Sequence, residues 1–450
     1  MNIAAICDYL SGKMGYRIED SFHRYINEWA DWYKGYHKPF HHYCDYNGRD
    51  TVELDRYSLK MAKKVCEDWA NMLLNENTQI CTNNKNASAF LNEVLDKNNF
   101  KVNANALIEK TFALGTGAFA LRIDGYKIGI DYITADCIIP INYRNGEITE
   151  VAFASDILHK GKHYTYIESH LTDTYGSYII TNEYLDETFT PVILDNKVAR
   201  RYETGSSTPW FTIIKPNITN NICFSSPMGI SVYANAIDVL KGLDLAYDNL
   251  CTDFFLGGKM IMMNEAVIGR EENGMRIAPQ FSKRRLFMSV GDSIIDGAMY
   301  QEYNPLLRVD ENRAGINAQL DFLASKCGLG ERYYNFDKYD INTATQVMSE
   351  NSTLFRTVKK HELLLHKALT QLCKSILEIG GFKNTEVSVI FDDSIIEDTS
   401  TLKAQDRNDV AMGIMQKYEY RMKYYGEDEQ TARKKVENTI ENAKGNLKRT

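Results

Sequence analysis

The chain has 450 residues, 44% of them hydrophobic, and carries a formal net charge of −8 at pH 7. This length exceeds that of a typical single domain and the apolar content suffices for more than one core, so we expect several packed units. The acidic balance excludes a protein that holds nucleic acid through a strongly basic surface. Residues 401–450 differ, since they hold 11 Lys and Arg against 8 Asp and Glu and are locally basic.

The nine cysteines are scattered and odd in number, and none forms a C-x-x-C pair. This pattern argues against a disulfide framework and against a zinc site, so we expect reduced thiols in the core. No basic segment followed by an apolar run opens the chain, and no stretch reaches the roughly 18 apolar residues that a membrane span needs. We therefore predict neither a signal peptide nor a membrane-spanning helix.

Residues 1–50 are rich in aromatic residues and histidine. We predict a surface arm whose rings pack on the body of the protein or on a neighbouring chain. A metal site is the alternative, but the histidine spacing matches no common ligand pattern, and the surface arm is preferred. The histidines concerned are His37, His41 and His42.

Two amphipathic helices are predicted next, over about 53–76 and 103–114. In the first of them, Val65, Trp69 and Leu73 recur at helical spacing and mark a buried face.

The second helix ends at Gly115-Thr-Gly117, which superficially matches the dinucleotide-binding pattern G-x-G-x-x-A. A dinucleotide site needs a strand before the glycines and a helix after them, whereas here the helix comes first. We therefore expect a tight helix-to-strand turn at these glycines and no nucleotide site.

Residues 118–215 alternate apolar and polar positions, which predicts an antiparallel meander. Four dipeptides with glycine in second place are typical of hairpin turns. They are Asp124-Gly125, Asn145-Gly146, Lys160-Gly161 and Tyr175-Gly176. All eight prolines lie at or before Pro305, so the rest of the chain can support long helices.

A helix is predicted from Ser226-Pro227 to about Phe255, because proline behind a serine cap suits the first helical turn. Gly257-Gly258 should end it. The next segment is too small for a core of its own, so we expect it to fold against copies of itself. Its short strands are expected at 260–263, 285–289 and 298–303.

A further helix over about 310–327 stops at Gly328, and an aromatic and charged loop follows at 331–340. The next predicted helix, about 345–379, is on the order of 50 Å long at a rise of 1.5 Å per residue. Its first turns are polar and its last turns keep an apolar stripe, so one end should face solvent or a channel. The remaining predicted elements are a strand over 386–396 and helices over 401–425 and 427–444.

Signatures of three enzyme classes are missing or incomplete. The chain has no G-x-x-x-x-G-K-[ST] loop of an ATPase and no G-x-S-x-G elbow of a hydrolase. A nuclease needs carboxylates that converge on metal ions about 4 Å apart, but Asp392 and Asp393 are neighbours in a predicted strand and point to opposite faces. We predict no enzyme activity.

A collinear series of segments carries a resemblance to a known family. The segments are 60–76, 229–258 with Asp244-Leu-Ala-Tyr-Asp248, Asn304-Pro-Leu-Leu-Arg308, Gly328-Leu-Gly330, Thr343-Ala-Thr345 with Ser349-Glu350, and Phe391-Asp-Asp-Ser-Ile-Ile396. In this order they resemble the portal proteins of tailed bacteriophages of the siphophage type, ring-shaped DNA gates at one capsid vertex. The resemblance implies an α+β portal fold with a β-rich wing, two stem helices, a small α/β clip, a long kinked tunnel helix and a helical crown.

The resemblance also implies a division of the chain into domains. The implied parts are a wing over 1–225, a first stem helix over 226–259, a clip over 260–308, a second stem helix over 309–330, a tunnel loop over 331–344, a tunnel helix over 345–381, a wing-closing strand over 382–400 and a crown over 401–450.

By the same resemblance, the chain forms a ring, expected to be a dodecamer, that serves as the channel for packaging and ejection of double-stranded DNA. The implied partners are the terminase large subunit, the head–tail adaptor, the major capsid protein and the scaffolding protein. The implied location is the virion, after assembly in the cytoplasm of the host bacterium, and no catalytic residue, cofactor, metal or membrane is implied. Another oligomeric structural protein of a capsid or tail, without a DNA channel, is the alternative.

Three groups of residues are implied as functional sites. The tunnel-loop group that would face DNA is Arg332, Tyr333, Tyr334, Asn335, Phe336, Asp337, Lys338, Tyr339 and Asp340. The tunnel-helix group is Thr345, Ser349, Glu350, Ser352 and Arg356, and the clip group for contact with the motor or adaptor is Lys283, Arg284 and Arg285. Lys338 is the cation of the loop that could contact a DNA phosphate. The aromatic residues of the loop could instead pack between subunits, and the clip cations could instead lie in a solvated turn.

Overall fold

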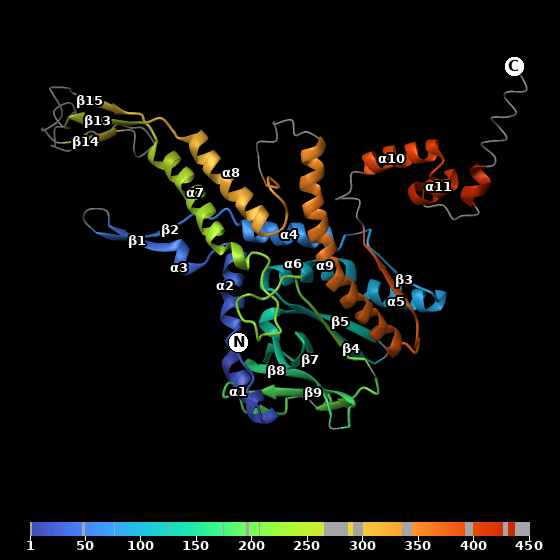
Figure 1. The fold of residues 1–450 in the computed structure, drawn as a ribbon. Helices are drawn as coiled ribbons and strands as arrows, with labels where there is room; N and C mark the ends of the chain where they lie inside the picture. The colour runs from blue at the N-terminus through green and yellow to red at the C-terminus, as the bar shows by residue number, and fades with distance from the viewer. Residues whose placement is uncertain are drawn as a thin grey trace, which may run out of the picture. The chain divides into compact units, whose positions relative to one another are not determined.

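The computed structural model describes residues 2–46, 50–75, 77–125, 127–173, 175–194, 198–206, 208–264, 287–290, 300–334, 344–391, 399–425 and 431–436. The chain divides into two compact units, Met1–Ile390 and Phe391–Thr450. In the first unit, a body of helices and sheets carries a two-helix projection (Figure 1).

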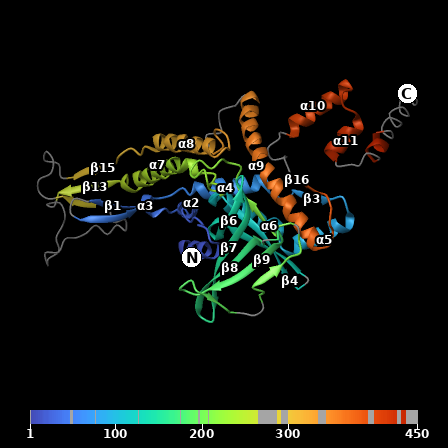
Figure 2. The same ribbon diagram turned by 60° about the horizontal axis from the view of Figure 1, so that its bottom comes forward.

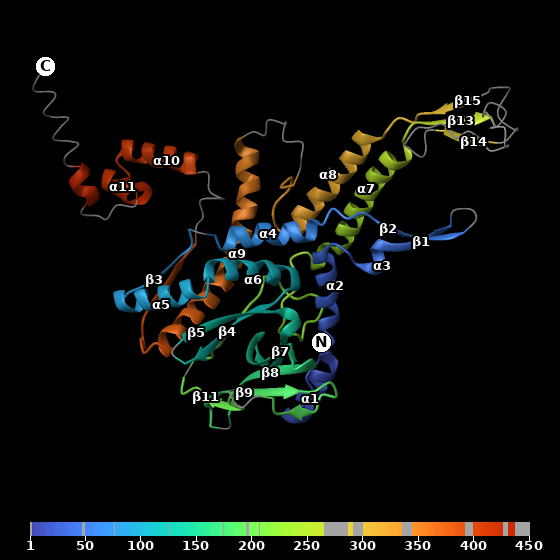
Figure 3. The ribbon, with the colours of Figure 1, turned by 180° about the vertical axis from the view of Figure 1, so that it is seen from behind.

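Four of the described helices of the body pack on one another, and α4 lies next to α6 at the base of the projection (Figures 1 and 3). Trp69 of α4 is fully buried and stacks on Phe112 of α6, with ring centroids 5.7 Å apart. The predicted apolar face of this helix is therefore confirmed, but its predicted start is wrong because residues 51–55 pair as a strand instead. The helices are α2 (His23–Lys34), α4 (Met61–Leu73), α5 (Lys85–Lys97) and α6 (Phe100–Leu114).

The predicted antiparallel meander is confirmed, and it is divided between two sheets. The smaller sheet has the order β12-β4-β5, and the larger has the order β10-β9-β8-β7-β6, with β11 also on β9. Asn145-Gly146 and Lys160-Gly161 both have two successive positive φ angles, as a two-residue type I′ turn requires. The strands are β4 (Gly117–Asp124), β5 (Lys127–Thr134), β6 (Ile138–Arg144), β7 (Glu147–His159), β8 (Lys162–Thr172), β9 (Tyr178–Leu185), β10 (Pro191–Val192), β11 (Arg201–Glu203) and β12 (Phe211–Ile214).

Gly115 and Gly229 lie back to back where α6 turns into β4. Gly115 has a φ of 85°, and a Cβ on either glycine would overlap the carbonyl oxygen of the other. The predicted helix-to-strand turn is confirmed. The predicted helix start at Ser226-Pro227 is wrong, and α7 (Ile237–Leu256) begins later. The residues from Pro227 to Tyr233 are buried and irregular, and the short 3-10 helix η2 (Ala234–Ala236) follows them. The Val232 N–H donates to the Phe112 carbonyl at the end of α6 (2.9 Å).

The N-terminal segment belongs to the core, so the predicted surface arm is wrong. Helix α1 (Ile3–Met14) packs Ile6 and Leu10 against the larger sheet. In α2, Trp29 and Trp32 are only 1% and 2% exposed. The aromatic residues of this segment recur at helical spacing, which buries them together on one face.

Two further pairs of strands complete the first unit. Helix α3 (Lys38–His41) leads into a hairpin of β1 (His42–Tyr46) and β2 (Thr51–Asp55). The late strand β16 (Val387–Ile390) pairs with β3 (Gln79–Thr82), so the chain returns to its early part after the long helix. The strand was predicted over 386–396, and residues 392–398, including Asp392 and Asp393, lie outside the described residues.

The second unit contains α10 (Thr399–Met412) and α11 (Lys417–Tyr425). A single helix was predicted here, but Gly413 has a φ of 74° and ends α10. The two helices are joined by the Lys423–Asp406 ion pair (2.7 Å). Most of the helix predicted over 427–444 lies outside the described residues.

Helix α9 (Ala344–Ile379) is held to the body by His361. The His361 ring meets the rings of Trp69 and Phe112 edge-on, at centroid distances of 4.7 and 5.0 Å. Its Nδ1 accepts the backbone N–H of Asn217 (3.0 Å). Burial, with a smaller effect of the neighbouring Lys360 charge, lowers the pKa of His361 to about 3. The imidazole is therefore neutral in the folded protein at neutral pH.

This lowered pKa predicts a loss of stability in acid. The unfolded chain binds a proton at His361 near pH 6.5, whereas the folded chain does so only near pH 3. The stabilisation is therefore complete above pH 6.5 and is lost as the pH falls toward 3, by up to about 1.4 kcal/mol per pH unit. Tm measured by calorimetry should fall less steeply below pH 6.5 in His361→Asn than in the wild type. Equal slopes for the wild type and His361→Asn would contradict the assignment.

Candidate functional site

The two-helix projection, called the stem from here on, consists of α7 and α8 (Val309–Lys326). The helices run side by side in opposite directions in all three ribbon views (Figures 1 to 3). Their close approach is visible at Gly242, where a Cβ would lie 3.0 Å from the Gln319 Oε1. The side chains buried along the stem are Leu240, Leu243, Ile316, Leu320 and Leu323.

Asp253 clamps the far end of the stem. Its carboxylate accepts hydrogen bonds from the Arg308 Nη2 (2.8 Å) and the Asn312 Nδ2 (2.7 Å). The bond from Arg308, followed by that from Asn312, lowers the pKa of Asp253. The clamp joins the last turn of α7 to the first turn of α8. It therefore holds together the two helix ends between which the connecting segment runs.

A small sheet lies at the tip of the stem, within the segment predicted to be the clip. Its central strand β13 pairs in parallel with β14 and antiparallel with β15, so the predicted short strands are confirmed. The strands are β13 (Met260–Asn264), β14 (Phe287–Val290) and β15 (Tyr300–Tyr303). Lys283, Arg284 and Arg285 lie outside the described residues, so their role as a contact site stays a prediction.

Large apolar side chains are exposed along the stem. Phe254 and Leu256, at the end of α7, are both 54% exposed, and Leu306, just before α8, is 95% exposed. Because the helices are antiparallel, these residues gather at the same end of the stem. The full set of exposed apolar side chains, called the stem apolar set, is Leu245, Phe254, Phe255, Leu256, Leu306, Leu307, Val309 and Phe322.

Asp244 ties the root of the stem to the body. Its side chain is 5% exposed and accepts bonds from the Ser58 hydroxyl (2.8 Å), the Leu59 backbone N–H (2.8 Å) and the His41 Nε2 (3.1 Å). One turn later, Asp248 accepts the backbone N–H of Tyr57 (2.9 Å). A carboxylate taken out of water needs such donors, so the two aspartates fix the chain between β2 and α4 against the stem.

The geometry of His41 follows from the same network. The backbone N–H of His37 donates to the His41 Nδ1 (2.8 Å), which leaves Nε2 as the nitrogen that donates to Asp244. His37 faces Asp31 (3.6 Å), and His42 faces Asp55 (3.1 Å). The three histidines therefore face three different carboxylates. In the described part of the chain, no group of three His, Cys, Asp or Glu side chains is arranged to hold a metal ion.

The first residues of the predicted tunnel loop are held by α4. The Tyr334 hydroxyl donates to the Asp68 Oδ2 (2.8 Å), and Lys64 pairs with the other oxygen (2.6 Å). Burial, and then the Asp68 charge, raise the pKa of Tyr334 far above its usual range. Tyr333 packs edge-on against Tyr334, and Arg332 is exposed. The other predicted loop residues, Asn335, Phe336, Asp337, Lys338, Tyr339 and Asp340, lie outside the described residues.

The predicted tunnel helix is a single helix in the structure, α9. Its predicted buried stripe is confirmed by Val358, Leu365, Leu369, Leu372 and Ile376, which are all buried. Among the predicted site residues, Arg356 is exposed, while the backbones of Thr345, Ser349, Glu350 and Ser352 lie within the helix and their side chains are outside the description. The kink of this helix and its contact with DNA stay predictions.

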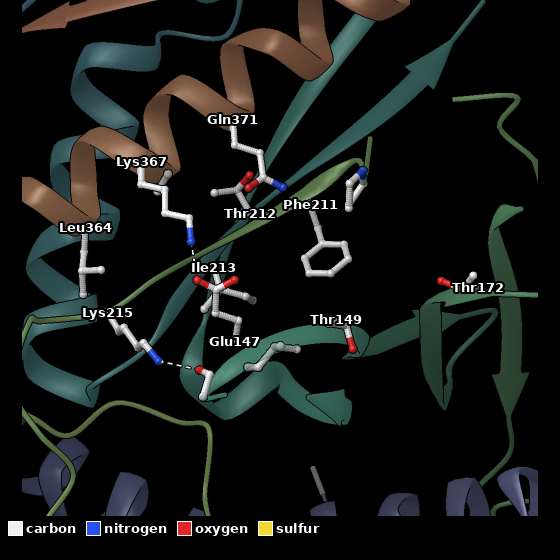
Figure 4. A pocket seen from close by; sticks show the side chains of 14 residues that line it. Glu147, Thr149, Thr172, Phe211, Thr212, Ile213, Lys215, Leu364, Lys367 and Gln371 are labelled. Atoms are coloured by element: carbon white, nitrogen blue, oxygen red, sulfur yellow. Dashed lines mark hydrogen bonds and ion pairs between the residues drawn. The ribbon is translucent and has the colours of Figure 1, made fainter. Parts of the chain in front are cut away.

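The body contains a groove of about 400 Å³ between α9, β12 and the start of β7 (Figure 4). Glu147 and Lys367 form an ion pair across it. The Lys215 Nζ donates to the carbonyl oxygens of Gly146 (2.9 Å) and Pro227 (3.2 Å), and burial lowers its pKa. The described residues that line the groove include one carboxylate and no His, Cys or Ser.

The Asp244 network makes a testable prediction about the chain between β2 and α4. Replacing Asp244 with Ala removes the acceptor of the Leu59 N–H and leaves His41 without its carboxylate. Hydrogen exchange followed by mass spectrometry should show the amides of residues 56–60 exchanging about tenfold faster or more. The matched control is Asp238→Ala, because Asp238 lies in the first turn of the same helix with a side chain that is 94% exposed. Unchanged exchange at these amides in Asp244→Ala would show that the network does not hold this segment.

Comparisons with known proteins bear on the whole chain. The family model described as "Phage portal protein, SPP1 Gp6-like" matches residues 16–443. Among solved structures, a chain from the virion of a native gene transfer agent particle is similar at 11% sequence identity and a TM-score of 0.40. That match covers 80% of this chain and 87% of the other. No curated protein matches.

The family match covers nearly the whole chain, including the body, the stem and the tip sheet. Portal proteins of this family are structural components that form ring oligomers associated with the capsid. In the part of the chain that the structure describes, no helix is both long and apolar enough to cross a lipid bilayer. The chain belongs to the family of SPP1 Gp6-like phage portal proteins and is a structural component of a virion.

Proposed function

We propose that twelve copies of this chain form a ring at one vertex of the capsid, with a channel for packaging and ejection of double-stranded DNA. The ring docks the terminase motor through its large subunit and later the head–tail adaptor, and it contacts the major capsid and scaffolding proteins. It assembles in the cytoplasm of the host bacterium. In a chain of this family, the observation that supports the proposal best is the stem apolar set, carried on two helices that are clamped to each other.

The stem apolar set needs a partner outside the chain. Soluble monomers rarely expose large contiguous apolar patches, and Leu306 is 95% exposed while Phe254 and Leu256 are more than half exposed. Burial of such side chains against a neighbouring copy stabilises an assembly by about 1.5–3 kcal/mol for each fully buried side chain. A contact between two different surfaces of identical subunits closes into a ring when the rotation between them allows it.

The proposed ring is acidic as a whole. At −8 per copy, twelve copies carry 12 × 8 = 96 excess negative charges. An acidic ring repels DNA phosphates at long range, whereas every phosphate held by a Lys or Arg would add salt-sensitive affinity. In this proposal Lys338 of the tunnel loop makes a sparse phosphate contact. The exposed Arg356 and the polar first turns of α9 face the channel.

The tip sheet is the proposed docking site for the motor and the adaptor. Its place at the far end of the stem puts it away from the body, and the Asp253 clamp holds both of its connections (Figure 1). Lys283, Arg284 and Arg285 are the proposed contact residues, as cations that meet acidic groups of the partners.

The first test is the mass and symmetry of the purified protein, by native mass spectrometry with negative-stain class averages. We expect closed rings of twelve with an open channel wide enough for a duplex. The double variant Phe254→Ser with Leu256→Ser should lower the fraction of protein in rings by about tenfold or more, since two apolar contacts per subunit are lost. The control is Leu158→Ser, at the tip of the β7–β8 hairpin and 67% exposed, which should leave ring formation unchanged.

Filaments, sheets or closed tiles without a channel would contradict the proposal and favour another structural role. Rings that form equally well in the double variant would show that the stem apolar set does not drive assembly.

A further inference from the structure

The β1–β2 hairpin projects from the body on the same side as the stem (Figures 1 and 2). Five residue pairs form its ladder, from His42↔Asp55 to Tyr46↔Thr51. Within the described ranges, neither of its two strands pairs with a third strand. An isolated two-stranded hairpin is marginally stable in water, so it needs a surface to pack on.

The two faces of the hairpin differ in character. Successive side chains point to opposite faces, and the register places Tyr43 across from Leu54 and Val52 across from Asp45 on the same face. This is called the apolar face from here on. Leu54 is 38% exposed there. The opposite, polar face carries His42, Cys44, Tyr46, Thr51, Glu53 and Asp55.

The root of the hairpin is rigid. On the polar face, Asp55 accepts bonds from the Tyr36 hydroxyl (2.9 Å) and pairs with the His42 Nδ1 (3.1 Å). The Arg56 guanidinium lies 4.1 Å from the centroid of the Tyr43 ring. Beyond these residues, Asp244 and Asp248 fix the next segment to the stem, as described above. The hairpin is therefore presented in a set direction, with Arg56 over the Tyr43 ring and Leu54 and Asp45 of the apolar face exposed.

A second copy of the chain is the partner that fits this face. The hairpin and the stem leave the body from the same junction at Asp244, so in a ring both reach toward the same neighbours. The hairpin offers a small apolar face that also carries the exposed Asp45, and the stem offers Phe322, 59% exposed, with the exposed Lys326 one turn later on the same side of α8. The two surfaces are different, and a contact between different surfaces is the kind that repeats around a ring.

We propose that the apolar face of the β1–β2 hairpin packs on the stem of the adjacent copy, around Phe322, with Asp45 of that face next to Lys326. This inference rests on the proposed ring and adds to it a specific contact between neighbours. The hairpin thereby links the body of each copy to the stem of the next copy. The Asp244 network that fixes a subunit's own stem also sets the direction in which its hairpin projects.

The test is a photo-crosslink made between copies labelled with different nitrogen isotopes. A benzoylphenylalanine placed at Leu54 on ¹⁵N-labelled protein, co-assembled with unlabelled protein, should join a heavy copy to a light copy within the α8 peptide. The same crosslinker at Glu53, on the polar face, should give about tenfold less of this product. Products confined to single copies, or joined elsewhere than α8, would overturn the inference.

Paired substitutions give a second readout by native mass spectrometry. Tyr43→Ser with Leu54→Ser should reduce the fraction of protein in rings by about tenfold or more, whereas the polar-face control Cys44→Ser with Thr51→Ala should assemble as the wild type does. If the wild type and the apolar-face variant form rings equally well, the hairpin contact is refuted while the proposed ring stands. If the wild type forms no rings, the proposed function fails as well, so the two failures are distinguishable.

Discussion

The buried carboxylate of Asp244 is the interaction on which the arrangement of stem and body depends. It lies in the first half of α7 and accepts bonds from a histidine, a hydroxyl and a backbone amide that all come from residues 41–59. Removal of a buried charge from its donors costs about 3–5 kcal/mol, so the stem cannot swing away from this segment cheaply. The direction of the stem relative to the body is therefore part of the folded structure of each subunit.

A fixed direction matters for a protein that closes into a ring. Twelve copies require a rotation of about 30° between neighbours and thirteen require about 28°, so a small change of angle changes the number of subunits. The clamp at Asp253, the edge-on packing of His361 between two aromatic rings and the paired glycines at 115 and 229 all limit such changes. In the proposed ring, the apolar side chains exposed on the stem supply the attraction between copies, and the rigid junctions set its geometry.

The sequence predicted the features that depend on local pattern. Glycine dipeptides located the hairpin turns, helical spacing located the buried faces around Trp69 and along α9, and the ordered motifs indicated the family. It failed where distant contacts decide. The chain before α7 is buried and irregular because it bonds to the end of α6, and the partner of β16 is β3, about 300 residues earlier. The role of Asp244 was also missed, although a lone Asp on a helical stripe of apolar residues is a signal of a buried acceptor.

The measurement that tests this account most directly is the distribution of ring masses for Asp244→Asn beside the wild type, by charge-detection mass spectrometry. Asparagine keeps the size of the side chain and can still accept the Leu59 N–H, but its amide nitrogen cannot accept from His41 and Ser58. The account predicts one ring size for the wild type and a mixture of sizes with open assemblies for the variant. A variant that closes into the same single ring as the wild type would show that this carboxylate does not set the angle between stem and body.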